Sequence, residues 1–181
     1  MSRRLAIALA PALVLRAVAG ATGSHAPHPE PASYSCPVAV RFSPHGGAEQ
    51  EVIATLRRAR VSVHAAVFGL TNRAIEAALK DLAQAGVRVA VKADRSQSAG
   101  REQSAVLDRL RTAGVVVEIP RFRWLLHDKF AVVDRRWVIT GSFNWTTSAE
   151  RRNRENVLIL DCPSLADLFE AEWESIASSR G

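Results

Sequence analysis

Four polar side chains stand at the two ends of a segment whose middle is apolar, and together they could act on a phosphate group. They are His127, Lys129, Ser142 and Asn144. An imidazole can serve as a nucleophile or an acid, while an ammonium, a hydroxyl and an amide can donate hydrogen bonds to an anion. Such donors would stabilise the charge that builds on phosphate oxygens during transfer. Any one of these residues alone would more often be an ordinary surface group.

A β-hairpin would bring the four side chains together. Apolar runs rich in β-branched and aromatic residues flank the polar residues 134–136, a pattern typical of two strands and a tight turn. With the turn centred on the last two of these residues, Lys129 would lie opposite Ser142, and His127 opposite Asn144. Because strand side chains alternate between faces, all four would then share one face. A slip of one residue would scatter them, and Arg-Arg is not a favoured turn sequence.

The spacing of these residues resembles the signature of the phospholipase D superfamily. The segment reads His-x-Lys, four residues, Asp, six residues, Gly-Ser-x-Asn, and all six named positions are filled. They are His127, Lys129, Asp134, Gly141, Ser142 and Asn144. Only one copy is present, as in the small single-motif branch typified by bacterial endonucleases, in which two subunits share one site.

The resemblance implies a role for each polar residue. His127 of one subunit would attack phosphorus to form a phosphohistidine, and His127 of the other would protonate the leaving oxygen. Lys129 and Asn144 would hold the phosphate oxygens, with Ser142 assisting. Glu155, eleven residues beyond Asn144, would hydrogen-bond the catalytic imidazole and fix its tautomer. Glu155 could instead pair with a neighbouring arginine.

The other two motif residues are expected to be structural, and no metal or other cofactor is expected. By strand parity Asp134 faces away from Lys129, so it is expected to accept amide hydrogen bonds of the turn rather than to contact phosphate. Gly141 would permit close approach of the backbone to the phosphate, or a bend. A lone His beside an Asp and a Lys lacks the ligand count for zinc, and the ammonium would repel a cation.

Basic charge gathers around the motif. The whole chain has a formal net charge of +6, and residues 121–154 hold eight Lys and Arg against three Asp and Glu. A basic surface at the site is expected if the partner is a polyanion such as DNA, with RNA as a further candidate. The candidate nucleic-acid contacts are Arg121, Arg123, Trp124, Trp145, Arg151 and Arg152. The tryptophans could stack on bases at about 1–3 kcal/mol per base, or pack in the core.

Three functions follow from these patterns. The first is a metal-independent, nonspecific endonuclease that acts as a homodimer on DNA, with RNA as a further candidate substrate. The second is a lipid phosphodiesterase, which should expose an apolar rim near the site; the candidates are Trp124, Leu125 and Leu126. The third is a nucleic-acid-binding protein that does not cleave, and the complete motif argues against it.

The N-terminal region resembles an export signal. Two arginines precede an apolar run at 5–15, and small residues near 17–21 suit cleavage, so 1–21 is interpreted as a signal peptide or an uncleaved N-terminal anchor. The resulting location is the bacterial periplasm or the exterior, with no stable membrane association after cleavage. Export would let Cys36 and Cys162 form a disulfide, although two free thiols are equally compatible with the sequence.

The remaining chain divides into a Pro/Ser-rich linker at 22–37 and a phospholipase D-like nuclease domain at 38–181. From residue 38 the pattern alternates strands with helices, including helices at about 47–60, from a Thr71 cap to 84, and at 102–112. This order predicts an α/β sandwich with a mixed, largely parallel sheet and helices on both faces. The hairpin and a strand at 156–160 extend the sheet, and a helix at 164–178 closes it.

Overall fold

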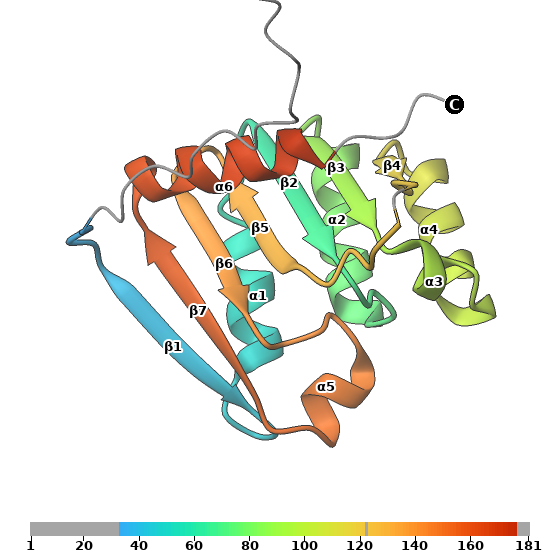
Figure 1. Cartoon of the computed structure of the whole chain (residues 1–181), viewed down its shortest axis with the longest axis horizontal. Coiled ribbons are helices and arrows are strands. Elements are labelled where there is room, and N and C mark those ends of the chain that lie inside the picture. The colour runs from blue at the N-terminus through green and yellow to red at the C-terminus, as the bar shows by residue number, and fades with distance from the viewer. Residues whose placement is uncertain (1–32, 122, 177–181) are drawn as a thin grey trace, which may run out of the picture. The chain divides into compact units, whose positions relative to one another are not determined.

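A mixed β-sheet organises the part of the chain that the structure, a computed structural model, describes: residues 33–121 and 123–176 (Figure 1). The expected leader at 1–21 and most of the expected linker lie outside these residues. The elements are, in chain order, β1 (Val38–Ser43), α1 (Ala48–Leu56), β2 (Ser62–Val67), α2 (Arg73–Gln84), β3 (Arg88–Ala93), α3 (Arg95–Ser98), α4 (Arg101–Thr112), β4 (Val116–Glu118), β5 (Lys129–Val133), β6 (Trp137–Gly141), α5 (Thr147–Arg151), β7 (Glu155–Asp161) and α6 (Pro163–Ser175).

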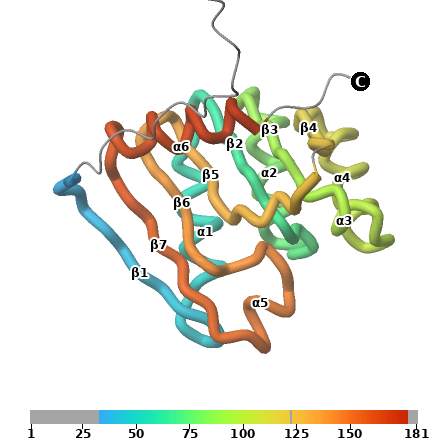
Figure 2. The backbone as a smooth tube through the Cα atoms, viewed as in Figure 1, coloured from blue at the N-terminus to red at the C-terminus, as the bar shows by residue number. Residues whose placement is uncertain are grey.

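The sheet confirms the predicted fold class but not the predicted predominance of parallel pairing. Its seven strands lie in the order β1-β7-β6-β5-β2-β3-β4. Only β2 with β3 and β3 with β4 pair in parallel, while the other four pairings are antiparallel. The cause is that only the early part of the chain uses helical crossovers between strands. The backbone trace in Figure 2 shows β5, β6 and β7 running back and forth beside β2.

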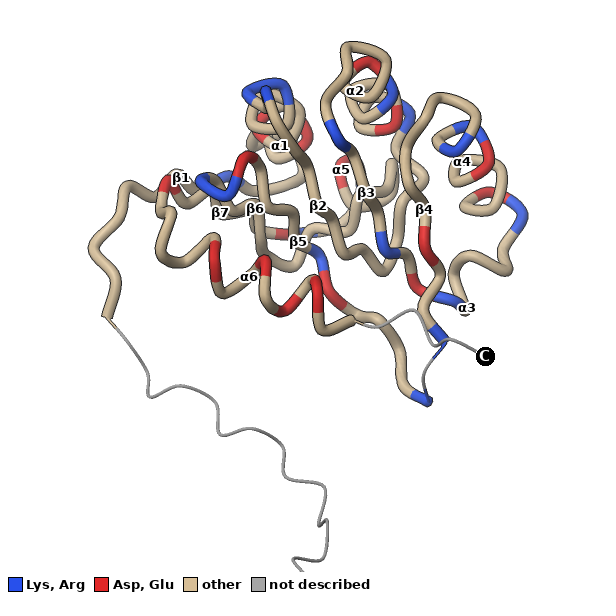
Figure 3. The backbone as a smooth tube through the Cα atoms, turned by 90° about the horizontal axis from the view of Figure 1, so that it is seen from above, with Lys and Arg blue, Asp and Glu red and all other residues tan. Residues whose placement is uncertain are grey.

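Helices cover both faces of the sheet, as predicted. Helices α1, α2 and α4 pack on one face and α6 packs on the other (Figure 3). Alternate residues of β2 follow this division. Val63, Ala65 and Val67 lie in the core on the face that α1, α2 and α4 cover, whereas Ala66 joins Phe130 in a second cluster under α6. Strand β2 is therefore buried on both faces, which makes it a rigid support for the residues at its end.

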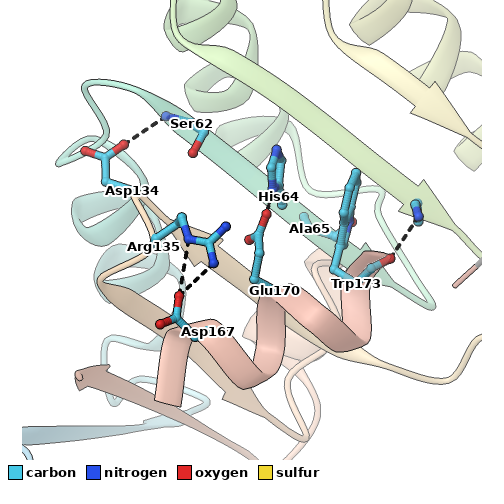
Figure 4. A network of polar contacts seen from close by, with 9 residues as sticks. Ser62, His64, Ala65, Asp134, Arg135, Asp167, Glu170 and Trp173 are labelled. Carbon is cyan, nitrogen blue, oxygen red and sulfur yellow. Dashed lines mark hydrogen bonds and ion pairs between the residues drawn. The ribbon is translucent and has the colours of Figure 1, made fainter. Parts of the chain in front are cut away.

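Polar contacts as well as apolar packing attach α6 to the sheet (Figure 4). The indole Nε1 of Trp173 donates to the carbonyl of Ala65 at 3.0 Å, and its ring stacks on that of His64 at 4.4 Å. The carboxylate of Glu170 contacts Nδ1 of the same imidazole. From β3, the buried Lys92 donates to the carbonyl of Trp173 at 2.8 Å. The helix is thus held to β2 and β3.

Local signals explain where the second helix starts. The side chain of Asn72 accepts hydrogen bonds from the amides of Ala74 and Ile75 at 2.9 and 3.1 Å, so Asn72 is the N-cap of α2. The predicted cap, Thr71, is wrong by one residue, because its own amide donates to the carbonyl of Trp145 at 2.9 Å. That bond ties the loop between β2 and α2 to the end of the hairpin.

The hairpin register differs from the prediction by one residue. Ala131 pairs with Ile139 and Val133 with Trp137, so the turn is centred on Arg135 rather than between Arg135 and Arg136. The backbone φ angles of Asp134 and Arg135 are 51° and 50°, the left-handed values of a type I′ turn. The predicted alignment of Lys129 with Ser142, and of His127 with Asn144, is therefore wrong.

The side chain of Asp134 explains this turn. Its carboxylate accepts hydrogen bonds from the amides of Arg60, Val61 and Ser62 at 2.8 to 2.9 Å. The predicted acceptor role is thus present, but the donors are the first residue of β2 and the two residues before it, and not amides of the turn itself. These bonds also occupy the backbone beyond α1, which ends at Leu56 and not near residue 60 as predicted. Burial alone would raise the pKa of Asp134, but the three amides outweigh it and lower the pKa.

Removing this carboxylate should destabilise the fold. We expect Asp134→Ala to lower the free energy of unfolding by about 1–3 kcal/mol, because three backbone amides, that of Ser62 in a part-buried position, lose their acceptor. The lowered pKa in the folded state means that this stability is present above the ordinary aspartate pKa and is lost as pH falls through the folded value. Asp134→Asn should keep part of the stability and lose the pH dependence.

Denaturant unfolding at neutral and acidic pH measures both effects. Replacement of the exposed Asp81 on α2 by alanine is the matched control and should change little. Equal losses of unfolding free energy in Asp134→Ala and Asp81→Ala would contradict the role assigned to Asp134.

A disulfide closes the domain. Cys36, just before β1, is bonded to Cys162, just before α6, with Cα atoms 5.4 Å apart and a sequence separation of 126. Of the two alternatives that the sequence left open, the structure has the paired one. Among the described residues, no helix is both long enough and apolar enough to span a bilayer.

Candidate active site

The motif residues meet at one edge of the sheet. Because β2, β5, β6 and β7 are successively antiparallel neighbours, the end of β2 lies beside the start of β5, the end of β6 and the start of β7 (Figure 1). Lys129 pairs directly with Val67, the last residue of β2. The amide of Phe68 then donates to the carbonyl of Asp128 at 2.8 Å, which extends the pairing into the loop.

His127 and Lys129 form a pair at this edge. The Lys129 Nζ atom donates to the carbonyl of His127 at 2.5 Å and lies 3.0 Å from Nδ1 of its imidazole. The aromatic ring of Phe68 packs against the imidazole, with ring centroids 4.5 Å apart, and lies 5.1 Å from the ammonium. His127 is exposed and Lys129 is half-buried. The imidazole is therefore held from one side and open to a reactant on the other.

Charges near this pair influence proton binding. Burial lowers the pKa of Lys129, and the charges of Asp128 and Glu155 act in the opposite direction. Burial raises the pKa of Asp128, and so does the negative charge of Glu172 on α6. The ammonium of Lys129 thus sits where desolvation strengthens its attraction for an anion.

Glu155 contacts the hairpin end rather than the imidazole. The hydroxyl of Ser142 donates to one of its carboxylate oxygens at 2.6 Å, and the side-chain amide of Asn153 donates to the other at 3.0 Å. The hydrogen bond to His127 that the resemblance implies is therefore replaced by these two. Ser142 also accepts from the amide of Asn156 at 3.1 Å, so its hydroxyl joins β6 to β7.

Gly141 is required by a neighbouring strand. Its φ angle is 142°, and an added Cβ would lie 2.3 Å from the carbonyl oxygen of Asn156. Of the two predicted reasons for a glycine here, the structure shows the bend, with the close approach made by the β7 backbone. This bend turns the chain out of β6 toward Asn144.

Asn144 reaches the site from the loop after β6. It lies beside Gly69, and its Oδ1 atom is buried without a hydrogen-bond partner among the described residues. The next residue, Trp145, bonds to the loop after β2: its amide donates to the carbonyl of Gly69 at 2.9 Å. Only 1% of Trp145 is exposed, so its predicted contact with nucleic acid is wrong and the core alternative holds. Its burial is what positions Asn144.

Two buried polar residues that the sequence did not reveal support the site from behind. The side-chain amide of Gln103 on α4 accepts from the amide of Leu70 at 2.8 Å and donates to the carbonyl of Phe68 at 3.3 Å. Asp94, after β3, accepts from the amide of Leu126 at 3.0 Å, one residue before His127. Both act on backbone groups, so no motif spacing marks them. The only hint was a polar residue at an otherwise apolar helix position.

The remaining candidate nucleic-acid contacts are exposed, and they lie on two segments. Arg121, Arg123 and Trp124 belong to the loop before His127, where 73% of Trp124 is exposed and the guanidinium of Arg123 lies 4.7 Å from its ring centroid. Arg151 and Arg152 lie at the end of α5, on the other side of Asn144 in sequence. In residues 33–121 and 123–176, no group of three or more His, Cys, Asp or Glu side chains is placed to hold a metal ion.

Comparisons with known proteins agree with the mixed sheet and with a site built for phosphoryl transfer. A family model described as "Cardiolipin synthase, PLD-like domain" matches residues 52–177. A phospholipase D of Rickettsia bellii (strain RML369-C) is 32% identical over 164 residues, which cover 87% of this chain and 81% of that protein. The human mitochondrial cardiolipin hydrolase is 39% identical over 134 residues, but they cover only 52% of its length.

Solved structures give the same result. The crystal structure of Nuc, a phospholipase D family member from Salmonella typhimurium, superposes with a TM-score of 0.75 at 30% identity, covering 78% of this chain and 93% of that one. Fold, site and relatives together define a phosphodiester hydrolase. The chain belongs to the phospholipase D superfamily.

Proposed function

We propose that this phosphodiesterase is a nonspecific endonuclease that cleaves DNA, and also RNA, through a phosphohistidine intermediate and without a metal ion. The observation that carries the proposal is the exposed His127 beside Lys129, at a sheet edge whose flanking segments carry the exposed Arg123, Arg151 and Arg152. The polymer's phosphate binds Lys129, and the Lys129 contacts with His127 give way to contacts with phosphate oxygens. A half-turn of the Asn144 amide presents its Nδ2 donor to the same phosphate.

A second copy of the chain completes the site in this proposal. Displacement at phosphorus needs a nucleophile on one side and an acid at the leaving oxygen on the other. One hairpin supplies one imidazole, so His127 of a twofold-related copy is the acid, and it then activates the water that releases the product. Glu155 orients Ser142 and, through its charge, favours the protonated form of Lys129.

Lipid phosphodiester hydrolysis is the second candidate, and one observation favours it. Trp124 and Leu125 are 73% and 56% exposed, directly before the site, which is where an enzyme acting on a bilayer would insert apolar side chains. Two of the relatives carry lipid-related names, phospholipase D and cardiolipin hydrolase. The arginines near Trp124 and Leu125 suit anionic lipid headgroups as well as nucleic acid.

We also propose that the domain works outside the cytoplasm, in the periplasm or the exterior. The bond between Cys36 and Cys162 supports this location, because structural disulfides form and persist in oxidising compartments. The signal-peptide pattern at 1–21 points the same way.

One assay separates the candidate functions. The purified chain and its His127→Ala variant are incubated with plasmid DNA, structured RNA and cardiolipin vesicles in excess EDTA. Cleavage of nucleic acid that persists in EDTA and is absent from the variant is the expected result. Turnover of lipid alone would select the second candidate, and retention of DNA without cleavage would mean a binding protein. Loss of cleavage in EDTA would contradict the metal-free scheme.

A further inference from the structure

A groove lined by arginines begins next to the candidate active site, on the side of the sheet away from α6. It consists of two adjoining pockets of about 340 and 380 Å³ that share Thr71 and Glu102 in their linings. The first lies between the starts of α2 and α4, and the second lies between α4 and α5. Its basic lining residues are Arg73, Arg101, Arg109, Arg151 and Arg152.

Four of these arginines have charge to offer a ligand. Arg109 is committed to Glu76, to which its Nε donates at 2.7 Å. Among the described residues, the guanidinium groups of the other four, which are exposed, form no ion pair. Against them the groove contains one exposed carboxylate, that of Glu102. The lining therefore has a clear positive excess.

Helix stability does not account for this charge. Arg73 and Arg101 are the first residues of α2 and α4, the end of a helix where a cation is unfavourable. Helix α6, on the other face of the sheet, differs because all of its charged residues are acidic: Asp167, Glu170, Glu172 and Glu174. Figure 3 shows these acidic positions together on the far side of the sheet from α2 and α4. A polyanion bound at the site is thus repelled on one side and attracted on the other.

Hydrogen-bonded loops connect the lining of the groove to the segment that carries Asn144. Thr71, which lines both pockets, donates its amide to the carbonyl of Trp145, and Thr147 lies three residues beyond Asn144. The hydroxyl groups of Thr71, Thr147 and Ser148 line the same depression and add neutral hydrogen-bond donors. Alternating guanidinium and hydroxyl groups suit the repeated phosphates of a nucleic-acid strand.

We infer that this groove binds the sugar-phosphate backbone of the substrate strand beyond the scissile phosphate, and that Arg73 and Arg101 are contacts for it alongside Arg151 and Arg152. The inference rests on the proposed nuclease function and deepens it. A nucleic-acid strand can contact His127 and the groove at the same time because it is a polymer, whereas a single lipid headgroup is too short to contact both. The backbone contacts carry no base preference, in agreement with nonspecific cleavage.

Binding measurements test the groove separately from catalysis. In a His127→Ala background, affinity for a fluorescently labelled single-stranded oligonucleotide is measured by anisotropy over a range of salt concentrations. The added double substitution Arg73→Ala/Arg101→Ala should weaken binding by about tenfold or more and reduce the slope of log K against log salt by about 0.7 for each arginine removed.

Controls make every outcome informative. Arg111→Ala, at the opposite end of α4 and outside the groove, should change neither affinity nor slope, and Arg101→Lys should keep most of the slope. Unchanged binding in the double variant, while the chain with His127 still cleaves the oligonucleotide, overturns the groove and leaves the nuclease proposal standing. If the chain neither binds nor cleaves nucleic acid, the nuclease proposal fails and the groove inference with it.

Discussion

A chain in which asparagine replaces His127 should cleave nucleic acid at least about 10³-fold more slowly than the unaltered chain. Asparagine is polar and similar in size to part of the ring, but it cannot form the covalent intermediate or transfer the proton. Because His127 is exposed, the substitution should leave the unfolding midpoint unchanged. Single-turnover kinetics with a defined oligonucleotide measure the rate, and rapid denaturation at alkaline pH, where the P–N bond survives, should trap a labelled histidine adduct only in the unaltered chain.

The proposal that two subunits share one site leads to a second expected result. When the unaltered chain is mixed with a threefold excess of the His127→Asn chain and subunits exchange, activity per unaltered subunit should fall to about one quarter, because random pairing leaves few dimers with two imidazoles. The control is a mixture of the unaltered chain with Arg88→Ala, a substitution at an exposed position of β3. Its activity should equal the sum of the activities of the two chains measured separately. Constant activity per unaltered subunit in the first mixture would mean that one copy is sufficient.

Loss of the disulfide should be the largest stability effect. Cys36→Ser is expected to lower the free energy of unfolding by about 2–5 kcal/mol, since the bond closes a loop that contains nearly the whole domain and so restricts the unfolded chain strongly. Denaturant unfolding of the unaltered chain with a thiol reductant should give the same midpoint as this variant.

The comparison between the two cysteines separates the covalent link from local packing. Cys36 is partly exposed, whereas Cys162 is 2% exposed, so Cys162→Ser should lose somewhat more because a hydroxyl is buried there. In the double variant the losses should not add, because either substitution alone already breaks the link. A midpoint that is insensitive to reductant would contradict a structural role.

The sequence predicted the parts of the molecule that depend on short-range pattern. The spacing from His127 to Asn144 identified the family, and the alternation of strands and helices gave the α/β class and helices on both faces. The hairpin register was not predictable in the same way. It is set by hydrogen bonds that the carboxylate of Asp134 accepts from the amides of Arg60, Val61 and Ser62, more than 70 residues away in sequence.

Other errors have the same origin. Trp145 resembles an aromatic contact residue when only its neighbours in sequence are considered, but the loop after β2 covers it. Gln103 and Asp94 were missed because each binds the backbone of a distant segment, and glutamine or aspartate in such a place leaves no periodic signal. Tertiary partners, which a single sequence does not show, decide each of these cases.

The bond between Cys36 and Cys162 also determines how the domain responds to mechanical force. Strand β1 is an edge strand of the sheet and pairs with β7 alone. Tension applied to the chain before β1 would otherwise break its hydrogen bonds with β7 one at a time. Tension that arrives at Cys36 passes instead through a covalent bond to the start of α6. Pulling from the N-terminal side would therefore load α6 before β1, and reduction would let β1 separate from the sheet first.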